Sequence, residues 1–107
     1  MHMNRIERLE KIIVDNPNDT FALFALAKEY EKLNDLRKSI QLFEKLLLVD
    51  NKYIGVYYHL GKIYEQLEEI NKALNIYESG ILIAQELKDF HALSELKNAK
   101  VNLEIEM

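Results

Sequence analysis

Few residues in this sequence have the type and spacing that chemistry at a single site would need. The three histidines, His2, His59 and His91, lie far apart along the chain, and no H-E-x-x-H or Glu-x-x-His spacing occurs. Cysteine is absent, which excludes disulfides and thiolate ligands. The sequence therefore predicts no metal, no cofactor and no enzymatic activity.

The glycines of this sequence are better explained by close packing of helices than by a phosphate-binding loop. Between Gly55 and Gly61-Lys62 the spacing is one residue too long for such a loop, and Ile63 stands where Ser or Thr is needed. Glycine inside a helix costs about 0.5–1 kcal/mol relative to alanine, so its presence needs a reason. Gly61 and Gly80 are expected where two helix backbones approach closely.

The composition indicates a single compact domain. The chain has 107 residues, of which 49% are hydrophobic and 30% charged, and only one is proline. The net charge is −4, and positive and negative residues are interspersed along the whole sequence, so no basic stripe that could bind nucleic acid is present. With no apolar signal core and no cysteine, we expect a cytoplasmic protein that does not enter a membrane.

The sequence repeats itself with a period of 34 residues. When residues 20–53 are laid over residues 54–87, eight identical pairs coincide. They are Leu26/Leu60, Lys28/Lys62, Tyr30/Tyr64, Glu31/Glu65, Leu33/Leu67, Lys38/Lys72, Glu44/Glu78 and Leu48/Leu82. The pairs around them conserve size, for example Phe24/Tyr58, Ala27/Gly61, Ser39/Ala73 and Phe43/Tyr77. Each copy is therefore expected to be one structural unit.

Within each copy, apolar residues recur at steps of three and four, which is the period of two amphipathic helices. The two helices of the first copy are separated at Asn34-Asp35. Asp35 can cap the second helix, and Asn18 or Asp19 the first, because these short side chains reach unpaired backbone amides. Each copy is predicted to be helix, turn, helix.

These residues resemble the tetratricopeptide repeat family, whose pattern has Leu then a small residue, Tyr, a small residue, an aromatic, another small residue and a closing Pro, which both copies lack. The second copy carries the pattern as Leu60, Gly61, Tyr64, Ala73, Tyr77 and Gly80. The first copy has Leu26, Ala27, Tyr30, Ser39 and Phe43, then Leu46 where a small residue is usual. The resemblance implies an all-α fold, a right-handed superhelix of antiparallel helix pairs, similar to short stand-alone bacterial proteins of this family.

The flanking segments extend the pattern. Residues 4–15 look like the second helix of an incomplete repeat, and Pro17 falls on the closing position of the family pattern. Residues 89–105 carry one more apolar stripe and look like a capping helix. One domain is therefore expected over residues 1–107, with a half repeat, repeats at 20–53 and 54–87, and a cap.

The resemblance also implies where a partner binds, because the first helix of each repeat lines a concave face in this family. Carried onto this sequence, the peptide-binding groove consists of Phe24, Lys28, Tyr58, His59 and Lys62. Aromatic rings and ammonium groups suit a peptide with apolar and acidic residues. In the competing interpretation the rings pack against neighbouring helices and the lysines form a solvated face.

The family resemblance predicts a protein-interaction module that acts as an adaptor or scaffold. The set of Lys and Asn side chains that grips acidic chaperone tails is absent, since Phe24, Lys28 and His59 occupy its positions. The alternative is a structural unit that self-associates into a homodimer by end-to-end or groove stacking. Both hypotheses predict a protein partner and no nucleic acid.

Overall fold

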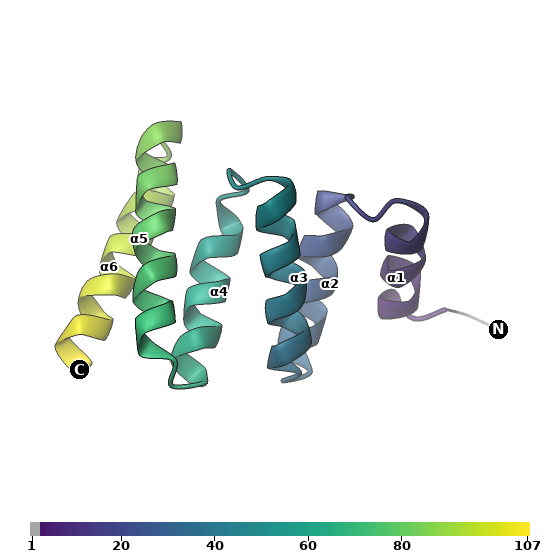
Figure 1. Cartoon of the computed structure of the whole chain (residues 1–107), viewed down its shortest axis with the longest axis horizontal. Helices are drawn as coiled ribbons and strands as arrows, with labels where there is room; N and C mark the ends of the chain where they lie inside the picture. Colours follow the sequence, from purple (N-terminus) through teal and green to yellow (C-terminus); the bar gives the residue numbers. More distant parts are fainter. Residues whose placement is uncertain (1–2) are drawn as a thin grey trace. The chain divides into compact units, whose positions relative to one another are not determined.

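The computed structural model describes residues 3–107, and every regular element in this range is an α-helix (Figure 1). The chain divides between Asn51 and Lys52 into two compact units. The N-terminal unit contains α1 (Arg5–Asp15), α2 (Thr20–Lys32) and α3 (Leu36–Val49), and the C-terminal unit contains α4 (Gly55–Gln66), α5 (Ile70–Leu87) and α6 (Phe90–Glu106). His2 lies outside the described residues. The predicted all-α fold of sequential antiparallel helix pairs is confirmed.

Short polar side chains start four of these helices. Asp19 accepts a hydrogen bond from the Ala22 amide at 2.9 Å, and Asp35 accepts one from the Lys38 amide at 3.4 Å. Both predicted caps are thereby confirmed, with Asp19 rather than Asn18 at α2. Asn4 caps α1 in a reciprocal capping box with Glu7, and Asp89 caps α6.

The turns between paired helices also repeat. Asn34 between α2 and α3, and Glu68 between α4 and α5, both adopt a left-handed backbone with φ of 60°. These residues are separated by the 34-residue period. Asn tolerates this conformation well, whereas Glu accepts a strain of about 1 kcal/mol or more there. The same turn is therefore imposed on two different residues by the helix pairs on either side.

The core of the N-terminal unit joins α1 to α2. Leu9 of α1 is buried against Ala22, Ala25 and Leu26 of α2. Burying one Leu side chain is worth about 1.5–3 kcal/mol. A polar contact adds to this attachment, since the Tyr30 hydroxyl donates to Glu10 Oε1 at 3.0 Å. Burial, and then this hydrogen bond, raise the pKa of Tyr30.

The core of the C-terminal unit forms where α5 packs between α4 and α6. Both glycines lie at contacts between helices, as predicted, but the nearest atoms at each belong to side chains and not to the backbone of the neighbouring helix. A Cβ atom at Gly61 would lie 2.7 Å from Cδ1 of Tyr77, and one at Gly80 would lie 2.6 Å from Cβ of Tyr57 and 2.9 Å from Cδ1 of Leu96. Gly80 is thus the point at which all three helices of this unit meet.

Candidate functional site

On α2, the predicted residues Phe24 and Lys28 lie together. The Lys28 ammonium stands 5.5 Å from the centre of the Phe24 ring, within the range of a cation–π contact. The same ring meets Phe43 of α3 edge-on, with centroids 5.8 Å apart. Phe24 therefore agrees with both interpretations of the aromatic residues, as helix packing and as part of a binding surface, because it packs against a neighbouring helix and remains half-buried.

Around this pair lies a hollow of about 380 Å³ on the N-terminal unit. We call it the α1/α2 hollow; it is lined by Arg5, Phe21, Phe24, Ala25, Lys28, Glu29 and Lys32. Three cationic side chains and one carboxylate leave an excess of two positive charges. Phe21 is 65% exposed and offers an uncovered ring at its edge. The hollow thus combines an apolar wall with positive charge.

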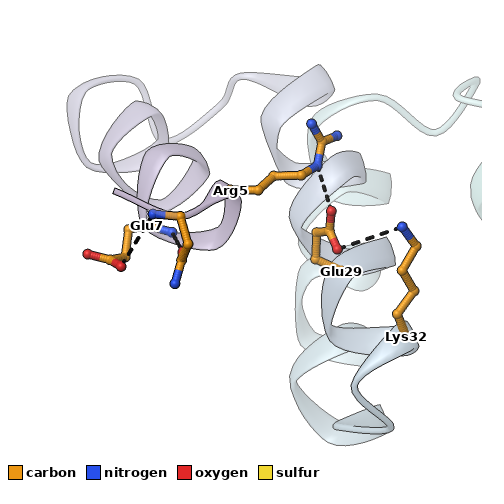
Figure 2. A network of polar contacts seen from close by, with 5 residues as sticks. Arg5, Glu7, Glu29 and Lys32 are labelled. Atoms are coloured by element: carbon orange, nitrogen blue, oxygen red, sulfur yellow. Dashed lines mark hydrogen bonds and ion pairs between the residues drawn. The ribbon is translucent and has the colours of Figure 1, made fainter. Parts of the chain in front are cut away.

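The charges of the α1/α2 hollow are organised by Glu29. Its carboxylate accepts from Arg5 Nε at 2.6 Å, and Lys32 Nζ lies 3.9 Å from its second oxygen. Figure 2 shows Arg5 reaching from α1 to Glu29, with its two terminal nitrogens turned away from that carboxylate. Those guanidinium donors suit a second carboxylate, since arginine binds such groups through paired N–H donors.

On α4, the C-terminal unit repeats the lysine and aromatic pair. Lys62 Nζ lies 5.6 Å from the centre of the Tyr58 ring, and His59 meets that ring edge-on with centroids 6.3 Å apart. The three predicted residues of this unit therefore lie together. Whether they share one groove with Phe24 and Lys28 stays a prediction.

The lysine of the second pair has a carboxylate neighbour within its own helix. Lys62 Nζ is 3.7 Å from Oε2 of Glu65, and the same Glu65 oxygen accepts the hydrogen bond of the Tyr77 hydroxyl. Burial, and then this hydrogen bond, raise the pKa of Tyr77, so the hydroxyl keeps its proton and remains a donor. Part of the Lys62 charge is consequently balanced inside the unit.

Sequence reasoning missed Arg5 and Glu29. Arg5 has no counterpart across the period, since the residue 34 positions later is Ser39. Its position in the hollow results from the docking of α1 on α2, which joins residues far apart in the sequence. Glu29 lies one residue after Lys28, but the pattern carried no signal that distinguished it from other exposed glutamates.

Metal-binding groups and membrane-spanning helices are both absent from the described residues. Among residues 3–107, no three His, Asp or Glu side chains are grouped so that they could hold a metal ion. No helix in this range is both long enough and apolar enough to cross a membrane.

Comparison with known proteins gives one family. The model of the tetratricopeptide repeat matches residues 22–53 and 54–87. The crystal structure of a tetratricopeptide repeat domain protein from Salinibacter ruber is similar to this chain, with 42% identity and a TM-score of 0.76 over 80% of this chain and 96% of that one. A comparison with curated proteins found no match.

Two structures with lower sequence identity share the fold. A protein from Bordetella parapertussis has 24% identity and a TM-score of 0.85, covering 98% of this chain and 91% of that one. MamA has 20% identity and a TM-score of 0.70, covering 94% of this chain and 67% of that one.

Proposed function

Because the chain belongs to the tetratricopeptide repeat family, we propose that it is a protein-interaction module that binds a peptide segment carrying acidic and large apolar side chains. The observation that supports this proposal is the α1/α2 hollow, in which Arg5, Lys28 and Lys32 surround the rings of Phe21 and Phe24. The module works without catalysis, as an adaptor or scaffold, and we expect it in the cytoplasm.

The apolar part of the ligand supplies most of the affinity in this proposal. A Leu, Phe or Trp side chain on Phe21 and Phe24 would remove apolar surface of both molecules from water. Phe24 is already held by Phe43, so little rotamer entropy is lost when it is covered. A rigid ring of this kind is a favourable anchor.

The acidic part of the ligand supplies orientation and salt-sensitive attraction. A ligand carboxylate beside Lys28 and the outward nitrogens of Arg5 would meet donors that Glu29 leaves unused. Exposed ion pairs contribute only about 0.2–1 kcal/mol each. The site is therefore suited to weak, reversible binding in which charge selects the ligand.

The C-terminal unit adds a second, weaker contact in this proposal. Tyr58, His59 and Lys62 offer the same combination of ring and ammonium on α4. Lys62 already faces Glu65, so its attraction for an added carboxylate is smaller than that of Lys28.

Selection from a random peptide library displayed on phage tests the proposal without a known partner. We expect enrichment of Asp and Glu beside Leu, Phe or Trp. The variant Lys28→Glu with Lys32→Glu should lose this enrichment. The matched control is Lys11→Glu with Lys88→Glu, which changes the net charge equally at exposed positions outside the hollow and should keep it. Enrichment of basic peptides, or equal selection by both variants, would overturn the proposal.

A further inference from the structure

The exposed side of α6 carries three large apolar residues together with the polar residues Ser94, Lys97 and Glu104. Phe90, Val101 and Ile105 are 72%, 50% and 75% exposed. At about 100° per residue their spacing places them on one side of the helix. The buried residues lie on the opposite side, where α6 contacts α4 and α5: Leu96, Ala99 and Leu103.

The exposed side of α1 is mainly charged, with Val14, which is 78% exposed, as its most exposed large apolar residue. Glu7, Arg8, Lys11 and Asp15 are charged and exposed there. A head-to-tail contact, with α6 of one copy on α1 of the next, would bury those charges against hydrocarbon, which is strongly unfavourable. The apolar side of α6 is better matched by α6 of a second copy. Such a contact is isologous and closes at two chains.

Two charged residues beside the apolar side of α6 favour an antiparallel arrangement. Lys97 and Glu104 lie on the same flank, seven residues and about two turns apart. Within residues 3–107 neither side chain makes an ion pair. A twofold axis beside Val101 brings Lys97 of each copy next to Glu104 of the other, so that the dimer contains this ion pair twice.

We propose that two copies of this chain associate through α6, antiparallel and about a twofold axis at Val101. Val101 then packs against Val101 of the other copy, and Ile105 lies along the hydrocarbon stem of the opposite Lys97. Val101 and Ile105 are thereby removed from water, whereas Phe90, eleven residues before the axis, lies outside the contact.

The contact is small, and the dimer is correspondingly weak. One helix face buries less than the roughly 800 Å² per partner of a standard interface. We expect dissociation constants on the order of 100 μM, so the dimer forms at high concentration or when a partner brings two copies together.

Sedimentation equilibrium of the full chain over a wide concentration range tests the proposal. The mass should rise from 12.6 kDa towards twice that value. Val101→Lys should remain monomeric throughout, because it places two ammonium groups at the axis. The matched control is Val14→Lys on α1, which is 78% exposed in the wild type and should dimerise normally. A wild-type chain that stays monomeric near 1 mM would overturn the proposal and leave this face to a different protein.

A charge exchange tests the antiparallel register separately. Lys97→Glu should weaken the dimer at least severalfold, because it opposes two carboxylates across the axis. Adding Glu104→Lys to that variant should restore the wild-type dissociation constant, since each pair is recreated with its signs exchanged. A double variant that remains as weak as the single one would contradict the axis at Val101.

Discussion

The helix pairs α2/α3 and α4/α5 solve the same packing problem with different residues. The first pair has Ala27, Ser39 and Phe43 at its small and aromatic positions, and the Ser39 hydroxyl donates to the Ala27 carbonyl oxygen at 2.8 Å. In the second pair the equivalent residues are Gly61, Ala73 and Tyr77. Tyr77 carries the hydroxyl instead and donates it to Glu65.

The difference shows that the sizes of the packed side chains and the place of the buried hydroxyl group change together between the two pairs. A buried hydroxyl needs a partner, and each pair supplies one at a different place. The ring of Tyr77 lies where the methyl group of an alanine at Gly61 would stand, so the residue there must be glycine. Phe43 lacks the hydroxyl and coexists with Ala27. The repeat pattern thus requires that the three side chains fit together, and it does not fix the residue at each position separately.

The largest expected effect comes from a charge at the shared small position. Ala73 is fully buried, and Ala73→Arg should destabilise the protein by about 4 kcal/mol or more, because the charge is buried or separates two helices. The exposed Asn75→Arg on the same helix is the control. Thermal unfolding followed by circular dichroism measures both. An Ala73→Arg variant as stable as the control would refute the repeat register.

An intermediate loss of stability is expected at Gly61 and Tyr77, where the two helix pairs differ in both side-chain size and hydrogen bonding. Gly61→Ala should cost about 1–3 kcal/mol through the contact with the Tyr77 ring. Tyr77→Phe should cost about 1 kcal/mol through the lost hydrogen bond to Glu65. Together they should cost less than their sum, because a ring that no longer donates to Glu65 can move away from the added methyl group. Urea unfolding of the four proteins checks this, and costs additive within about 0.5 kcal/mol would contradict it.

The smallest effect concerns the hydroxyl of the first pair. Ser39→Ala should cost about 1 kcal/mol, because the buried bond to the Ala27 carbonyl is lost. Ala73→Ser in the second pair should change stability by less than that, since a serine there can donate to the carbonyl oxygen of Gly61. Equal losses in both variants, measured by urea unfolding, would show that the two pairs do not share this geometry.

Much of the fold was predictable because it is local. The repeated steps of three and four placed the helices, and the caps Asp19 and Asp35 followed from side-chain length. Glu69, the residue equivalent to Asp35, makes no side-chain cap bond to α5. The contacts at Gly61 and Gly80 were predictable because glycine destabilises a helix interior and is therefore expected only where a neighbouring helix leaves no room for a side chain.

The site was predictable only in part. Phe24 with Lys28, and Tyr58 with Lys62, lie one turn apart on a single helix, and their proximity follows from helical spacing. Arg5 depends on the docking of a different helix, and the Tyr77 contact depends on a turn between two helices. Such contacts need the tertiary structure, because no period in the sequence connects their residues.

The central claim is that lysines beside aromatic rings on α2 and α4 bind an acidic peptide. Fluorescence anisotropy titration of a labelled peptide from the library selection tests it most directly, at low and at high salt. Lys28→Glu with Lys62→Glu should raise the dissociation constant roughly tenfold at low salt, because two exposed attractions become repulsions. The ratio to wild type should shrink at high salt, where such charges are screened.

In the same titration, Tyr58→Ala should weaken binding with little change in its salt dependence, since an aromatic anchor acts through burial. Lys28→Glu alone should weaken binding more than Lys62→Glu alone, because Lys62 already faces Glu65 at 3.7 Å. Affinity that is unchanged in all four variants at both salt concentrations would contradict the account and remove the binding site from α2 and α4.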